Sequence, residues 1–168
     1  QIESRAFRNC SSVTKITIPK CSTYTLGTFA NCTSLKEVVF EGTVPGINPY
    51  AFDGTPWFEA KKNEDPFVII EGTIFYVDNE RVSGDVVIPD GITYINENAF
   101  TGNQKITSVT FPKGFVSIGE NAFSGCDNLV VAYLPKDLTE IDDNMFTSCY
   151  SLEAIYLPAS HLLDARGE

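Results

Sequence analysis

The sequence predicts a repeat solenoid of mainly β structure, in which each unit forms one turn of a coil and the units stack along one axis. Two observations lead to this prediction: isoleucines and phenylalanines each recur at intervals of 23 residues, and prolines close successive units at the same interval. The recurring residues are Ile95, Ile118 and Ile141, then Phe100, Phe123 and Phe146, then Pro112, Pro135 and Pro158. A fixed period of about 20 to 29 residues is typical of a leucine-rich right-handed coil, whose single units cannot bury an apolar face alone.

Six units share the pattern I-x-x-x-A-F-x-x-C-x-x-L-x-x-I-x-I-P with small departures. The first ends at Pro19, and the second is one residue shorter before its phenylalanine, Phe29. The third opens at Ile47 and departs from the pattern after Thr55. We therefore predict a solenoid over residues 1–158 with an irregular unit at about 55–85, followed by an irregular tail over 159–168.

The irregular unit has its own local signals. Thr55 and Pro56 form an N-cap followed by a proline at the first helical position, which predicts a short helix up to Glu64. Pro66 ends that helix, because the residue before a proline is pushed out of the helical region. Two apolar runs, 67–70 and 73–77, flank a Glu-Gly pair and predict a β-hairpin.

Each unit contains a strand in which apolar residues alternate, which directs every second side chain inward and its neighbours outward. Strands stacked about 4.8 Å apart would form one parallel sheet of six strands, with residues 68–70 as a seventh, spanning roughly 25 to 30 Å. Solenoids commonly bind partners through this extended face. The outward residues, our candidate binding residues, are Lys15, Thr17, Glu37, Val39, Asp85, Val87, Ser108, Thr110, Val131, Tyr133, Ala154 and Tyr156.

The C-terminal part of this face, Val131, Tyr133, Ala154 and Tyr156, is predicted to form one apolar and aromatic patch. Tyrosine is enriched at binding hot spots, but it is also a favoured strand residue, and the sequence supports both explanations equally. Trp57 is a second candidate anchor, although burial of the short helix against the array is the favoured interpretation.

The charge balance limits the partners. The chain carries 22 acidic and 12 basic residues, a formal net charge of −10, so we expect no nucleic-acid partner. The acidic residues are scattered, as on a solvated surface. No stretch is long and apolar enough to span a membrane. The first residues lie inside a repeat, so we expect no signal peptide in this sequence. We expect a monomer, and a piece of a longer protein.

Groups that could support chemistry are few, so we expect no enzyme, cofactor or metal site. Cys10, Cys32, Cys126 and Cys149 share one repeat position, which Thr55 and Asn103 occupy in other units. This pattern favours free thiols that meet backbone groups in a turn, with a bridge between neighbouring coils as the alternative.

The remaining candidates are interpreted in the same way. Cys21 is expected to be a loop thiol, and His161, the only histidine, a solvated tail residue. The acidic residues Asp137, Glu140, Asp142 and Asp143 lack the spacing of a calcium loop and are interpreted as a solvated turn.

Two motifs resemble the BspA-type leucine-rich repeats of bacterial surface proteins: Ala-Phe-Ser-Gly-Cys-Asp-Asn-Leu at 122–129 and Val-Val-Ile-Pro-Asp-Gly-Ile-Thr-Tyr-Ile at 86–95. Residues 55–70 are similar to an insert found in members from gut Firmicutes. The resemblance covers nearly the whole chain.

The resemblance implies a secreted or cell-surface location and an adhesin-type function. Members of the family are similar to proteins that bind extracellular-matrix and plasma proteins such as fibronectin and fibrinogen, or that promote aggregation between bacteria. We therefore expect a non-enzymatic module that binds a host extracellular-matrix or plasma protein, or a microbial surface protein or glycan. The alternative is a structural spacer with no ligand of its own.

Overall fold

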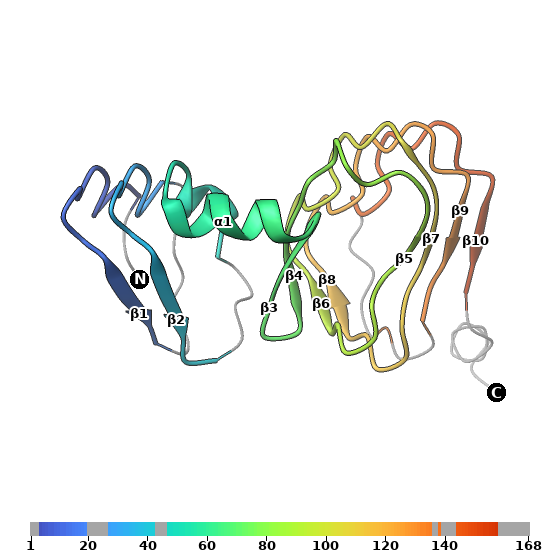
Figure 1. Cartoon of the computed structure of the whole chain (residues 1–168). Coiled ribbons are helices and arrows are strands. Elements are labelled where there is room, and N and C mark those ends of the chain that lie inside the picture. The colour runs from blue at the N-terminus through green and yellow to red at the C-terminus, as the bar shows by residue number, and fades with distance from the viewer. Residues whose placement is uncertain (1–3, 20–26, 43–46, 136–137, 139–143, 158–168) are drawn as a thin grey trace. The chain divides into compact units, whose positions relative to one another are not determined.

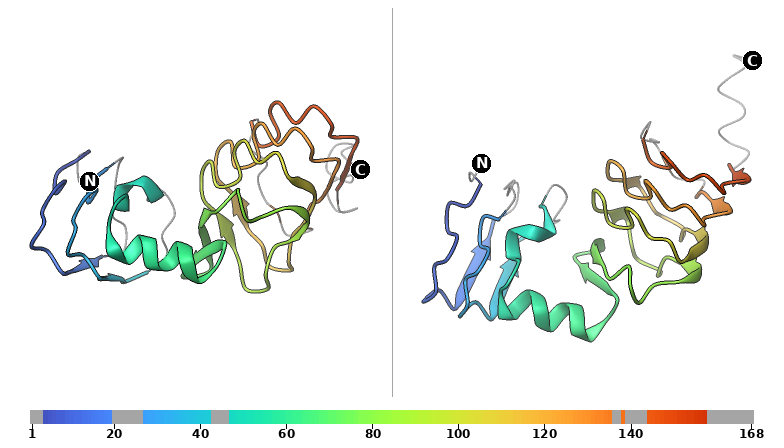
Figure 2. Two further views of the ribbon diagram at one scale, coloured as in Figure 1. Left: turned by 45° about the horizontal axis from the view of Figure 1, so that its top comes forward. Right: turned by 90° about the horizontal axis from the view of Figure 1, so that it is seen from above.

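The computed structural model describes residues 4–19, 27–42, 47–135, 138 and 144–157 (Figure 1). The chain divides into two compact units, Gln1–Tyr76 and Val77–Glu168. The boundary falls inside the segment that breaks the repeat pattern. Both units consist mainly of β-strands joined by turns, which confirms the solenoid predicted from the repeat period (Figure 2).

In the first unit, two repeat strands pair in parallel. They are β1 (Lys15–Ile18) and β2 (Glu37–Phe40), with Lys15 opposite Glu37 and Thr17 opposite Val39. The 3-10 helix η1 (Pro49–Phe52) follows them in the chain. Successive coils stack their phenylalanines: the ring centroids of Phe7 and Phe29 lie 5.5 Å apart, and those of Phe29 and Phe52 lie 5.6 Å apart. This ladder explains why the sequence keeps phenylalanine at one position of the repeat.

The predicted short helix is α1 (Pro56–Glu64), and its ends lie where the sequence places them. The buried Thr55 Oγ1 accepts a hydrogen bond from the Phe58 N–H at 3.2 Å and donates one to the Phe52 carbonyl at 2.7 Å. Asp65, extended before Pro66, caps the other end. Trp57 and Phe58 of α1 are buried, with Trp57 8% exposed, as the favoured interpretation of the sequence required.

The predicted β-hairpin is formed by β3 (Phe67–Ile70) and β4 (Thr73–Val77), which are neighbours in one sheet. The turn between them requires positive φ at both residues, 49° at Glu71 and 72° at Gly72. Phe75 of β4 packs against Phe52 and Phe58, with centroid separations of 6.1 and 6.2 Å, so the hairpin contributes to the core of the first unit.

The second unit contains a four-stranded parallel sheet in the order β10-β9-β7-β5. Two shorter strands, β6 and β8, pair in parallel on another side of the coil. The rings of Phe100 and Phe123 stack with centroids 4.6 Å apart, and those of Phe123 and Phe146 are tilted with centroids 5.7 Å apart, which repeats the ladder of the first unit. The strands are β5 (Gly84–Val87), β6 (Tyr94–Ile95), β7 (Ile106–Thr110), β8 (Ser117–Ile118), β9 (Val131–Tyr133) and β10 (Ala154–Tyr156).

The sheets differ from the sequence-based expectation in one respect. Instead of six strands in one sheet with residues 68–70 as a seventh, the described strands form a pair, β1-β2, and a separate set of four, while β3 pairs with β4. The physical reason is the capped helix. After Thr55 the chain enters α1 at the point where a regular unit would continue into its strand, so no strand follows β2 in its sheet.

Candidate functional site

The outer face of the four-stranded sheet presents two rows of side chains across neighbouring strands. The strand register places Asp85, Ser108, Val131 and Ala154 in one row, and Val87, Thr110, Tyr133 and Tyr156 in the other. Four strands at about 4.8 Å spacing extend over roughly 14 Å. All eight are among the candidate binding residues, and each is exposed or half-buried.

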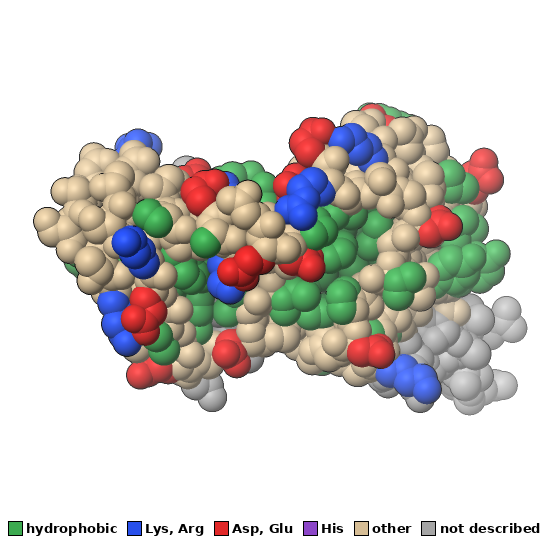
Figure 3. All heavy atoms as spheres, in the orientation of Figure 1, with side chains coloured by type: hydrophobic (Ala, Val, Ile, Leu, Met, Phe, Trp, Pro, Cys, Tyr) green, Lys and Arg blue, Asp and Glu red, His purple; other side chains and the backbone are tan. Residues whose placement is uncertain are grey.

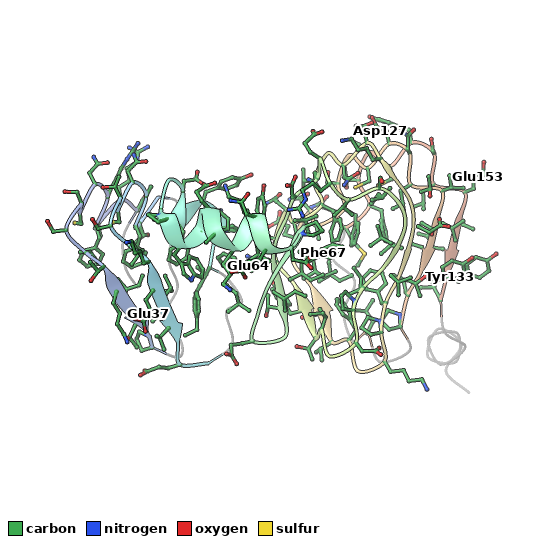
Figure 4. All side chains as sticks on the ribbon, in the orientation of Figure 1. Glu37, Glu64, Phe67, Asp127, Tyr133 and Glu153 are labelled. Atoms are coloured by element: carbon green, nitrogen blue, oxygen red, sulfur yellow. The ribbon has the colours of Figure 1, made fainter. Side chains whose placement is uncertain are left out.

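Tyr133 and Tyr156 dominate one end of this face. Their rings stack with centroids 4.9 Å apart and planes 7° from parallel, and 43% and 56% of these residues remain exposed. Figure 3 shows hydrophobic side chains gathered over β9 and β10, and Figure 4 labels Tyr133 on β9. The repeat period produces this pair, because Tyr133 and Tyr156 lie opposite each other in the parallel register.

The opposite end of the face is polar. Asp85 Oδ1 accepts hydrogen bonds from the hydroxyls of Ser108 at 2.8 Å and Thr107 at 3.0 Å. These two bonds, with that from Ser108 the stronger influence, lower the pKa of the Asp85 carboxyl below its usual value. The surface of the sheet therefore changes from an acidic, hydrogen-bonded end on β5 to an aromatic end on β10.

The four remaining candidate binding residues lie on β1 and β2 of the first unit. Lys15 Nζ and Glu37 Oε1 form an exposed ion pair at 2.6 Å. Thr17 lies beside Val39, which is 37% exposed. This pair of strands presents a mixed, mostly polar surface.

Beside β2 lies a depression that the sequence did not indicate, which we call the β2 groove. It consists of two hollows of about 450 and 360 Å³ that share Val38, Trp57 and Lys61 in their walls. Figure 4 labels one residue on each bordering element: Glu37 on β2, Glu64 on α1 and Phe67 on β3. The sequence indicated that the array is altered here, through the departure from the repeat after Thr55 and the helix and hairpin signals that follow, but it did not indicate a groove.

With the fold and these surfaces described, comparison with known proteins identifies the family. The family model of the BspA type leucine rich repeat region matches residues 1–80 and 68–163, with six copies. The chain belongs to the BspA-type leucine-rich-repeat family. A search of curated proteins finds no match.

Three solved structures are similar to this BspA-type chain at low identity. The leucine-rich-repeat protein TpLRR of T. pallidum is 19% identical, with 98% of this chain and 75% of that chain covered and a TM-score of 0.43. A leucine-rich cell surface protein of Faecalibacterium prausnitzii A2-165 is 19% identical, with 95% and 64% covered and a TM-score of 0.39. The pneumococcal vaccine antigen PcpA is 14% identical, with 75% and 40% covered and a TM-score of 0.42. The chain thus spans two fifths of the length of PcpA.

The side chain at the repeated cysteine position of the BspA-type unit forms a hydrogen bond to a backbone carbonyl. Cys32, Cys126 and Cys149 each direct the thiol to the carbonyl oxygen of the phenylalanine in the preceding coil, at 3.2, 3.2 and 3.1 Å. Asn103, at the same repeat position, donates from its side-chain amide to a different backbone carbonyl, that of Val82, at 3.2 Å. Among the described cysteines, all four at this position are free thiols, in agreement with the interpretation favoured by the sequence.

Groups for metal binding are not brought together in the part of the chain that the structure describes. No cluster of three histidine, cysteine, aspartate or glutamate residues could hold a metal ion there. No helix of the described residues is long and apolar enough to cross a lipid bilayer. Cys21, His161, Asp137, Glu140, Asp142 and Asp143 lie outside the described residues.

Proposed function

We propose that this BspA-type chain is a non-enzymatic, adhesin-type binding module of a secreted or cell-surface bacterial protein. Its partner would be a host extracellular-matrix or plasma protein, or a microbial surface protein or glycan. The family supports the location and the class of function. The observation that supports a site is the stacked, exposed pair of Tyr133 and Tyr156 at the end of the sheet of the second unit.

The pair suits recognition for a physical reason. Tyrosine offers a large rigid surface with a polar tip, and ordering it costs little side-chain entropy because only two torsions are fixed. Here the torsions are restricted in advance by the stack, so a partner that covers the rings would lose less entropy on binding. Val131 and Ala154, beside them on the same strands, extend the apolar surface without adding charge.

A second function, a structural spacer, is favoured by the same stack. Each ring already covers one face of the other, and an aromatic pair across neighbouring strands stabilises a sheet by about 0.2 to 1 kcal/mol. In that case the rings stabilise the coil and the unit has no ligand of its own.

One experiment separates these functions. The protein and a Tyr133→Ala, Tyr156→Ala variant are tested for binding to immobilised fibronectin, fibrinogen, other matrix proteins and a glycan panel. The matched control is Tyr150→Ala, because Tyr150 is 84% exposed and lies in a turn outside the sheet.

A binding module predicts saturable binding that the double variant loses and the control retains, with both variants folded. Equal binding by the double variant would move the site away from the tyrosine pair. Absence of binding across the panel, with a lower free energy of unfolding in the double variant, would favour the spacer.

A further inference from the structure

The strand β2 has one edge that no described strand occupies. The N–H groups of Glu37 and Glu41 donate toward the first coil, to the carbonyls of Thr14 and Ile18 at 3.2 and 2.9 Å. Backbone groups of alternate residues in a strand point to opposite edges, so those of Val38 and Phe40 face away from β1. In the sheet of which β2 is part, β1 is the only neighbour among the described strands.

The second unit contains an equivalent strand that is paired on both edges. There β7, a strand of the same repeat position, pairs with β5 on one edge and β9 on the other. In the first unit the chain leaves the coil at Thr55 and forms α1, so the place of the next strand beside β2 is not filled by a described strand. The β2 groove lies at this place, since its walls include both β2 and α1.

The groove offers apolar contacts as well as a strand edge. The hollow of about 360 Å³ is lined by Val39, Phe40 and Trp57 on one side and by Ile69 and Ile70 of β3 on the other. Ile69 is 43% exposed, although β3 is rich in apolar residues. Hydrophobic side chains can be seen below α1 in Figure 3. A strand placed here would cover apolar surface while its backbone pairs with Val38 and Phe40.

Charges at the two ends of the groove indicate which segment would fit. Glu37 is neutralised by Lys15 and Glu64 by Lys61, at 2.6 and 2.8 Å. Lys36 borders the hollow of about 450 Å³, and Glu71 borders the hollow of about 360 Å³. Neither residue is part of an ion pair among the described residues. The groove therefore has a basic end near the start of β2 and an acidic end at the hairpin turn.

We propose that the β2 groove binds an extended peptide segment of a partner protein by β-strand addition. The segment pairs with the backbone of Val38 and Phe40, places apolar side chains over Trp57, and carries an acidic group toward Lys36 and a basic group toward Glu71. A segment whose basic residue precedes its acidic residue then runs antiparallel to β2. Main-chain pairing provides affinity in this mode, and the side-chain positions provide specificity.

A second copy of the chain is the less suitable occupant. Each copy has a formal net charge of −10, so pairing of two β2 edges brings together two strongly acidic molecules. A segment with one basic and one acidic end meets no such repulsion. The proposal does not depend on the tyrosine pair, because all residues that it uses belong to the first unit.

The test uses a synthetic peptide, Arg-Thr-Val-Thr-Val-Thr-Asp, titrated into the whole chain. Trp57 is the only tryptophan and lines the groove, so its fluorescence reports on occupancy. Amide hydrogen exchange followed by NMR reports on strand pairing. The result expected is a saturable fluorescence change with slower exchange at Val38 and Phe40, and no change at Val39, whose N–H faces β1.

Matched variants test the charges. Lys36→Glu should weaken binding of the peptide by roughly threefold or more, as expected for one exposed charge pair reversed, while Lys113→Glu in the second unit makes the same charge change and should have no effect. The Tyr133→Ala, Tyr156→Ala variant should bind the peptide normally.

Two results would overturn the proposal. One is binding without slower exchange at Val38 and Phe40, or no binding at all in the millimolar range. The other is slower exchange at these amides that appears without peptide and increases with protein concentration, because the edge would then pair with a second copy.

Discussion

The thiol of Cys126 donates a hydrogen bond to the carbonyl oxygen of Phe100, 26 residues earlier, with 3.2 Å between sulfur and oxygen. Cys126 is completely buried. A buried carbonyl without a hydrogen-bond partner is costly, and water cannot reach this one. The contact therefore stabilises the stacking of two neighbouring coils.

Replacing Cys126 by alanine should lower the free energy of unfolding by about 2 kcal/mol, through the lost hydrogen bond and the small cavity left behind. Urea denaturation followed by circular dichroism measures this change. Cys10→Ala is the control, because Cys10 occupies the same repeat position but is only half-buried. An equal loss in both variants would contradict the assigned role of burial.

Gly119 lies where the backbones of two coils approach each other closely. A Cβ atom there would overlap the backbone nitrogen of Glu97, so Gly119→Ala forces the coils apart and should cost about 1 to 3 kcal/mol. Gly114→Ala separates this effect from backbone strain. Gly114 has a φ of 76° and open space around its Cβ position, so only a cost of about 1 kcal/mol is expected. Thermal or urea unfolding of both variants tests the order, and a larger loss at Gly114 would refute it.

The buried hydroxyl of Thr55 should be necessary for α1. Thr55→Val keeps the shape but removes the acceptor for Phe58 N–H and the donor to the Phe52 carbonyl, and should cost about 1 to 2 kcal/mol. Thr55→Ser keeps both bonds and should lose less. The free energy of unfolding and the fluorescence of Trp57, which is part of the helix, are the two measurements. Equal losses in both variants would show that the methyl group matters and not the hydroxyl.

The carboxyl of Asp85 should titrate below the usual aspartate range, because Ser108 and Thr107 donate hydrogen bonds to its charged form. Its pKa in the folded state is therefore lower than in the unfolded state. Its stabilising contribution is present above the unfolded value, about 3.9, and is lost as the pH falls through the folded pKa. NMR titration of Asp85 in the protein and in Ser108→Ala checks this. The variant should show a higher pKa, and an unchanged value would contradict the role of that hydrogen bond.

Cys149 should be the reactive member of its pair with Cys126. The neighbouring Cys126 side chain lowers the pKa of Cys149 to about 7, and the interaction between the two thiols, followed by burial, raises the pKa of Cys126. Alkylation of Cys149 by iodoacetamide in the folded protein should therefore rise through about pH 7, while Cys126 stays unmodified. Peptide mapping by mass spectrometry measures both. In Cys126→Ala the rise should move to higher pH, and faster modification of Cys126 would overturn the assignment.

The repeat period was sufficient to predict the coil and the opposition of Tyr133 and Tyr156, because equivalent residues of successive units must lie side by side. The ends of α1 and the hairpin were also predictable, since Thr55, Pro66 and the Glu71-Gly72 pair act through local backbone geometry. The division of the strands into separate sheets was not predictable from the sequence. Thr55 matches both the cysteine position of a regular unit and a helix N-cap, and which role directs the chain depends on how Trp57 and Phe58 pack.

The β2 groove was missed for the same reason. Its walls come from β2, α1 and β3, whose arrangement in space no periodic pattern encodes. The binding role of the strand face stays a prediction. Tyrosine at an outward strand position is expected both from its preference for strands and from its use in recognition.

The position of Thr55 has a practical consequence for protein engineering. The third coil completes its phenylalanine contact, to Phe29, before the chain departs at Thr55, so the added helix and hairpin leave the stacking of the ladder intact. Asn103 and Cys126 occupy the equivalent position in later coils. A designer who wishes to graft a foreign loop or a small domain onto this scaffold would therefore open the chain just after one of these residues, where this protein already accommodates an addition.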